Sequence, residues 1–350
     1  WLHMNFPLYS PTTPGAGRKP GYGTYGLAVH SHAVPNNCCK PVAGGAERGA
    51  HPRDTIEHSI GPVWEANHVW LIFIFVILWT SFPEAYASIT LTLFVPLTLA
   101  ALGIVLRGAS FAFRKAVVQL RHRRLFGAAF ALSSVLVPYC MGAVAGGIAS
   151  GRVPAGGQAG DPVHSWINAT SILGGILAVA AAAYLAAVYL VWDARRLSDN
   201  EMTEHFRRRA VISAGAVGVL GVIGIFVLRA DAPYLFQGLT SRALPLVILG
   251  TLCGVAALVL LLRGAPRGAR LLAVFAVASV IIGWAVAQWP YILPQTLTFS
   301  AAASPSGTLT AVLIVVVLAL LIVGPGFILL YVLDQRGLLP EEGAEEKPAV

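Results

Sequence analysis

The sequence predicts an all-α fold, a polytopic transmembrane helical bundle with eight visible spans. Of its 350 residues, 56% are apolar and only 11% are charged, whereas a soluble domain carries about 25% charged residues. The mean hydropathy is +0.71. Stretches of eighteen or more mostly apolar residues alternate with short basic loops, which is typical of spanning helices rather than of an outer-membrane barrel.

The first part of the chain differs from the rest. Residues 1–42 are rich in Pro, Gly, Ser and Asn and have no long apolar run, so neither a spanning helix nor a signal peptide is expected there. A polar loop and a short amphipathic segment follow from residue 43 to residue 60. Eight spans are then expected, with boundaries good to a few residues: 62–82, 85–106, 125–149, 166–192, 210–229, 243–262, 271–289 and 308–333.

The loops between these spans alternate in charge. After residue 42, eighteen Lys and Arg fall on one side of the alternation, and only Arg152, Arg229 and Arg242 fall on the other. Because positive residues are retained in the cytoplasm, the basic loops and the acidic tail at 336–350 are predicted to be cytoplasmic. The turn at Pro83-Glu84 is so short that the first two spans are expected to form an antiparallel hairpin.

Other functional classes find little support. The net charge of +8 comes from loop clusters, so it indicates membrane topology rather than nucleic-acid binding. The sequence contains no Walker loop, no dinucleotide-binding motif after a strand and no HExxH motif. Neither a metal site nor a disulfide framework is expected from the four cysteines, Cys38, Cys39, Cys140 and Cys253.

The strongest candidate site lies at the start of the first span. Glu65 and His68 are three residues apart and share a helix face, so they could form a proton relay near the cytoplasmic side. Alternatively, both could simply cap the helix or reach the membrane interface. Trp64 and Trp70 flank the pair; they suit an aromatic belt, or contact with a quinone or a haem edge.

Other residues that could bind a ligand also have alternative explanations. His164 and Met141 could be imagined as haem ligands, but no partner pattern supports either. The prolines at 290 and 294 prevent a regular helix, and the segment to Ser306 could line a pocket or support the structure. In or near the spans, buried amides more often join helices than bind ligands; those considered are Asn168, Gln237 and Gln288.

Several motifs resemble subunit II of the cytochrome bd-type quinol oxidases. Residues 61–71, GPVWEANHVWL, are similar to the family's GPxWDGNxVWL signature, and residues 82–87 are FPEAYA. Residues 106–114, LRGASFAFR, are similar to the family's LRGxxFxxR. The loop from Pro290 to Ser306 and the last span also agree, and the resemblance covers about residues 43–335.

The resemblance implies a bacterial inner-membrane oxidase that couples quinol oxidation to the reduction of O2 to water. Its partner, a homologous subunit I, would carry haems b and d and the quinol site, and a small accessory subunit could join them. This chain would ligate no cofactor; it would act as a scaffold and contribute to proton uptake. Glu65 stands at the family's acidic position, whereas Ala66 replaces a glycine and His68 a usually polar residue.

The resemblance also implies a ninth span that the sequence lacks. The family begins with a helix containing a GxDFGxG-like stretch, and residues 1–42 contain neither. We therefore expect this segment to be disordered, or to result from a wrong reading frame or a wrongly assigned start. Two rival functions stay open: a secondary transporter, for which no inverted repeat is evident, and a purely structural membrane subunit.

Overall fold

The computed structural model describes residues 64–116, 120–196, 198–264 and 268–335. All of these residues belong to the second of the two units into which the chain divides, Pro35–Val350. The predictions made for residues 1–42, for the segment up to residue 60 and for the acidic tail at 336–350 lie outside the described residues.

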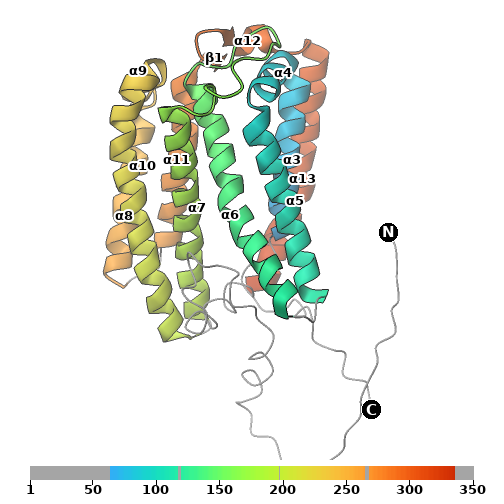
Figure 1. The fold of residues 1–350 in the computed structure, drawn as a ribbon. Coiled ribbons are helices and arrows are strands. Elements are labelled where there is room, and N and C mark those ends of the chain that lie inside the picture. Colours follow the sequence, from blue (N-terminus) through green and yellow to red (C-terminus); the bar gives the residue numbers. More distant parts are fainter. Residues whose placement is uncertain (1–63, 117–119, 197, 265–267, 336–350) are drawn as a thin grey trace, which may run out of the picture. The chain divides into compact units, whose positions relative to one another are not determined.

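The described part of the chain is built almost entirely of helices (Figure 1). The two short strands, β1 (Tyr291–Leu293) and β2 (Leu297–Thr298), pair antiparallel with an irregular register. The helices are α3 (Trp64–Ser81), α4 (Pro83–Thr92), α5 (Phe94–Ala116), α6 (Leu120–Ala149), α7 (Ala169–Arg196), α8 (Asn200–Asp231), α9 (Pro233–Thr240), α10 (Leu244–Leu262), α11 (Ala269–Gln288), α12 (Phe299–Ala302) and α13 (Ser306–Gln335).

The expected all-α membrane bundle is confirmed, with a smaller number of clear spans. Among the described residues, six helices are long and apolar enough to cross a membrane. The number of spans is seven if the bent pair formed by α3 and α4 is counted as one span. The apolar part of α5, Phe94–Ser110, is shorter. The six spans are Leu125–Ala149, Ala169–Arg196, Asn200–Asp231, Leu244–Leu262, Ala269–Gln288 and Ser306–Leu330.

The number of clear spans is lower than the expected eight because of the second expected span, 85–106. The chain bends by 120° between α3 and α4, and the helix is interrupted again at Leu93. Pro96 has no backbone N–H, so it cannot donate to the carbonyl of Thr92, where α4 ends. The expected hairpin therefore contains an additional short helix, α4, at its turn. The long helix α3 packs against α13.

Consecutive long helices pack side by side from α5 to α8, and α10 packs against α11. A very close approach joins α6 to α7. A Cβ added to Gly142 would lie 2.3 Å from the carbonyl oxygen of Gly174, and one added to Gly174 would lie 2.5 Å from that of Gly142. Glycine is therefore required on both helices for their backbones to meet, as in other tightly packed spanning helices.

The short elements gather at one end of the bundle, here called the capped end (Figure 1). It comprises α4, α9, α12, the two strands and the loop at 150–168. The contacts of α12 with α4 and with both strands, and those of α9 with α11, hold these elements together. The opposite end, where α7 ends and α8 begins, is here called the basic end.

Candidate functional site

Glu65 and His68 lie in the first two turns of α3, which begins at Trp64. The helical backbone supports the prediction that residues three positions apart share a face. The side chains of residues 64–69 are outside what the structure describes. The proton relay, the alternative capping role and the role of Trp64 therefore stay predictions.

Trp70 contacts a second helix. Its ring is half-buried, and its centroid lies 6.0 Å from that of Phe73 in an edge-to-face arrangement and 6.0 Å from that of Phe327 in α13. Aromatic pairs at this separation stabilise helix packing. The contact shows how α3 is held against α13 one turn beyond the candidate site.

The other end of α3 is fixed by the segment that leads into α13. The backbone N–H of Ser304 donates to the carbonyl of Ser81 at 2.9 Å, and its hydroxyl donates to the carbonyl of Thr80 at 2.8 Å. The last carbonyls of a helix have no partner within the helix. Ser304 supplies these partners, so the position of α3 is fixed at both ends.

One face of α4 binds the loop at 150–168. Glu84, Ser88 and Thr92 follow one another at intervals of four residues, and each accepts a hydrogen bond from a backbone N–H of the loop. The donors are Gly156 at 2.8 Å, Gly157 at 3.0 Å and Gly160 at 2.9 Å. The helical spacing thus presents three acceptors in a row to one irregular segment.

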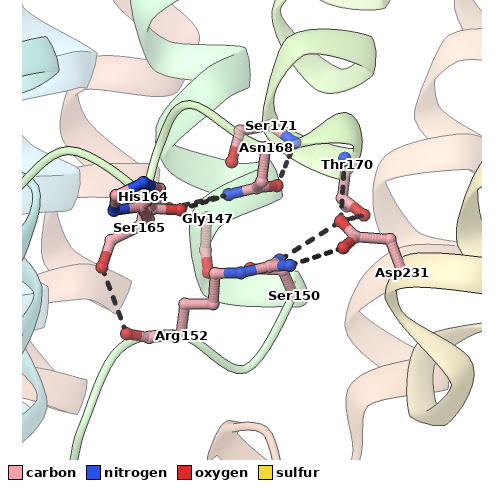
Figure 2. A network of polar contacts seen from close by, with 9 residues as sticks. All are labelled: Gly147, Ser150, Arg152, His164, Ser165, Asn168, Thr170, Ser171 and Asp231. Atoms are coloured by element: carbon pink, nitrogen blue, oxygen red, sulfur yellow. Dashed lines mark hydrogen bonds and ion pairs between the residues drawn. The ribbon is translucent and has the colours of Figure 1, made fainter. Parts of the chain in front are cut away.

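The same loop carries an ion pair, shown in Figure 2. The guanidinium of Arg152 donates to both carboxylate oxygens of Asp231, at 2.5 and 3.2 Å. Asp231 Oδ2 also accepts from the backbone N–H of Thr170 at 3.1 Å and from its hydroxyl at 2.6 Å. We call these three residues the Arg152 cluster.

The Arg152 cluster joins three separate segments. Arg152 comes from the loop, Thr170 from the first turn of α7 and Asp231 from the last residue of α8. A carboxylate at a helix N-terminus is favourable because it accepts from an unpartnered N–H and interacts with the helix dipole. The side chains are 34% and 18% exposed for Arg152 and Asp231, so water screens this pair less than a fully exposed one.

Next to this cluster, Asn168 caps α7. Its Oδ1 accepts from the N–H of Ser171 at 2.9 Å, and its Nδ2 donates to the carbonyls of His164 and Ser165, each at 3.1 Å. This contact favours the structural explanation for Asn168. Gln288 likewise donates to the carbonyl of Ile292 at 2.7 Å, whereas Gln237 is exposed.

His164 is bound by a neighbouring carboxylate. Its Nδ1 lies 2.8 Å from Asp161 Oδ2, and its side chain is 80% exposed. Backbone hydrogen bonds from His164 and Val163 lower the pKa of Asp161 from 3.8 to about 2. Met141 lies within α6. An exposed loop histidine of this kind does not fit a haem pocket, which is enclosed and largely apolar.

The segment after α11 is held in place by Arg242. Its guanidinium donates to the carbonyls of Ala287, at 3.0 Å, and of Trp289. The Tyr234 hydroxyl donates to the carbonyl of Trp289 at 3.0 Å and also accepts from Arg242. The Trp289-Pro290 bond is cis. These contacts favour the structural role for the proline-containing segment.

Sequence reasoning missed the polar contacts of the capped end. Asp231 and Thr170 are polar residues near helix ends, and nothing in their local pattern indicates that they meet. One signal was available. Arg152 and Arg242 break the charge asymmetry of the loops, and both make specific contacts at the capped end.

The described residues contain no group of three or more His, Cys, Asp or Glu side chains that could hold a metal ion. Of the predicted site residues, only Trp70 is seen in contact with its surroundings. Two sets of described polar contacts at the capped end are built on arginine, one around Arg152 and one around Arg242.

The comparisons with known proteins agree with one another. Residues 37–334 match the family model described as "Cytochrome bd terminal oxidase subunit II". "Cytochrome bd ubiquinol oxidase subunit 2" of Bacillus subtilis (strain 168) is 23% identical over 202 residues. That alignment covers 57% of this chain and 58% of the relative, so the chain matches less than two thirds of that protein's length.

A solved structure shares the fold. It is described as "The structure of bd oxidase from Geobacillus thermodenitrificans", and it aligns with a TM-score of 0.67 and 24% sequence identity. The alignment covers 80% of this chain and 86% of the other. The helical arrangement is therefore that of a chain found in a bd oxidase.

Proposed function

The chain belongs to the cytochrome bd terminal oxidase subunit II family, and from this premise we propose that it is the subunit II of a membrane complex that oxidises quinol and reduces O2 to water. The observation that carries the proposal is the family match over residues 37–334, which includes Glu65 and His68. The spanning helices of the described part suit a multi-pass protein of a bacterial membrane. We place its C-terminus in the cytoplasm because of the charge asymmetry of the loops.

The proposed partner is a homologous subunit I. By the family resemblance, it would hold haems b and d and the quinol site. The haems would supply electron transfer and O2 activation. This chain would support the partner through its apolar helix faces, for example that of α13, whose central part is not buried within the chain.

The proposed chemical contribution of this chain is proton delivery. Reduction of O2 to water consumes protons, so the buried reaction site needs a path for them. A carboxylate in a low-dielectric environment binds a proton more readily than one in water, and imidazole exchanges protons near neutral pH. Glu65 would take up protons at the start of α3, with His68 as the neighbouring relay on the same face.

The test compares quinol-dependent O2 consumption by membranes that contain the chain with its proposed subunit I, at matched haem content. Glu65→Gln keeps the size and hydrogen-bonding capacity of the side chain but cannot carry a proton as an acid. We expect it to lose activity by about tenfold or more while haem content is retained, in line with the effect of removing an acid–base group. His68→Asn should cause a smaller loss.

Glu84→Gln is the matched control. Glu84 is a carboxylate in the first turn of α4, beyond the far end of α3, and its contact with the N–H of Gly156 needs only an acceptor oxygen, which glutamine retains. Its activity should equal that of the wild type. Full activity of Glu65→Gln would contradict the proton role and favour a purely structural subunit, whereas wild-type membranes without haem or quinol-dependent O2 consumption would contradict the oxidase assignment itself.

A further inference from the structure

Four helix ends meet at the basic end of the bundle. Arg207, in the first turns of α8, donates to the carbonyls of Leu261 and Leu262 at the end of α10, each at 3.2 Å. Arg270, at the start of α11, lies over the rings of Tyr189 and Trp192 in the last turns of α7, at 5.2 and 5.3 Å. The ends of α7 and α10 and the starts of α8 and α11 therefore form one surface.

This surface is rich in arginine. The described part of these four helix ends carries seven arginines and four carboxylates, so positive charge remains even if each carboxylate neutralises one arginine. We call the seven the arginine surface: Arg195, Arg196, Arg207, Arg208, Arg209, Arg263 and Arg270. The carboxylates are Asp193, Asp199, Glu201 and Glu204.

Carboxylates of these helix ends already have local partners. Glu204 binds Arg207 at 2.8 Å through both of its oxygens, and Asp199 caps α8 by accepting from the N–H of Met202 at 3.0 Å. By contrast, Arg208 and Arg263 are exposed. A guanidinium presents a planar set of donors that matches a phosphate, so an exposed group of them favours a phosphate-bearing ligand.

Large apolar side chains continue directly from the arginine surface along the same helices. Leu262 is 58% exposed, Leu271 62% and Ile212 63%. The first two adjoin Arg263 and Arg270 in sequence, and Ile212 lies one turn beyond Arg208. A charged group with an apolar strip beside it matches a molecule that is anionic at one end and apolar along its length. A soluble anion would leave the strip uncovered.

We propose that the arginine surface binds the phosphate headgroups of anionic phospholipids, whose acyl chains lie against the exposed faces of α8, α10 and α11. Tyr189 and Trp192 suit this depth, because aromatic rings favour the headgroup level. The inference needs only the spanning helices and the basic end, and it does not depend on the proposed oxidase activity.

The test uses the full-length chain, purified with its membrane partner in detergent, and counts bound lipid by native mass spectrometry. Phosphatidylglycerol is the anionic probe and phosphatidylcholine the zwitterionic one. Arg208→Gln and Arg263→Gln each remove one exposed charge. Each should weaken phosphatidylglycerol binding by roughly fivefold, the usual contribution of one basic residue near an anionic membrane surface, and the double variant should weaken it further. Phosphatidylcholine binding should not change.

Arg229→Gln is the control, because Arg229 is an exposed arginine at the opposite end of the same helix, α8. It should bind phosphatidylglycerol like the wild type. If either test variant misfolds, as judged by gel filtration, Arg195→Gln replaces it. Wild-type phosphatidylglycerol binding by the double variant would overturn the proposal, as would equal loss of both lipids. If the double variant lost its protein partner but bound phosphatidylglycerol like the wild type, the proposal would also be overturned, and the arginine surface would be assigned to binding that partner.

Discussion

Asp231 connects two neighbours because its carboxylate accepts hydrogen bonds from both. One partner is the guanidinium of Arg152, and the other is the first turn of α7 through Thr170. Removing a partly buried carboxylate is destabilising, because the donors that it satisfied are left without an acceptor. The Arg152 cluster should therefore contribute to stability through the groups that it satisfies more than through net attraction of charges.

This reasoning predicts different effects for two substitutions of Asp231. Asp231→Asn keeps an acceptor for Thr170 but loses the ion pair, so the free energy of unfolding should fall by about 1 kcal/mol. Asp231→Ala removes every acceptor and should cost about 2–3 kcal/mol. Thermal unfolding of the detergent-solubilised protein measures both. Glu201→Gln, an exposed acidic residue at the other end of α8, is the control, and an unchanged melting temperature for Asp231→Ala would contradict the prediction.

At the scale of elements, the contact between α6 and α7 depends on the absence of side chains. Gly142 and Gly174 bring the two backbones together, and Gly146 also approaches α7, where a Cβ would lie 2.6 Å from Thr170 O. The first turn of α7 carries the capping contacts of Asn168 and Asp231. A change in the spacing of α6 and α7 should therefore also disturb the Arg152 cluster.

Gly142→Ala should separate the two helices and lower the free energy of unfolding by about 1–3 kcal/mol, the usual cost of overpacking. Gly215→Ala is the matched control, because nothing lies within 4 Å of a Cβ at that position of α8. It should be neutral or slightly stabilising, since alanine favours a helix more than glycine does. Thermal unfolding distinguishes the two, and equal melting temperatures would show that the helix contact tolerates a methyl group.

The sequence predicted the helices well where a long apolar run decides the structure. The fourth to eighth expected spans correspond to α7, α8, α10, α11 and α13, and most of their ends differ by only a few residues. The exception is α8, which starts ten residues earlier than expected, because Asp199 caps a charged first segment that hydropathy does not detect. The interruption at Leu93 was missed because the mostly apolar run continues through it, although Pro96 was a signal for it in the sequence. The Arg152 cluster was missed because it joins residues up to 79 positions apart.

At the scale of the whole molecule, the orientation of α5 determines the topology. Its 23 residues are about 34 Å long at 1.5 Å per residue, enough for a hydrocarbon core of about 30 Å. It starts next to Thr92, which binds the loop at 150–168, and it packs along α6, which ends at that loop. Although its apolar part is short, α5 therefore runs between the capped end and the basic end, as α6 does.

This arrangement predicts that the capped end faces the outside and the basic end faces the cytoplasm, in agreement with the retention of positive loops inside. Single cysteines at two exposed loop positions test it, after the native cysteines have been replaced by serine. Ala159→Cys, in the loop at 150–168, should react with an impermeant maleimide in intact cells. Ser198→Cys, in the turn between α7 and α8, should react only after the cells are permeabilised. Reaction at both positions in intact cells would contradict the topology, and so would reaction of Ser198→Cys alone. Reaction of Ser198→Cys alone would also place the start of α3 on the outer side, where Glu65 could not take up protons from the cytoplasm.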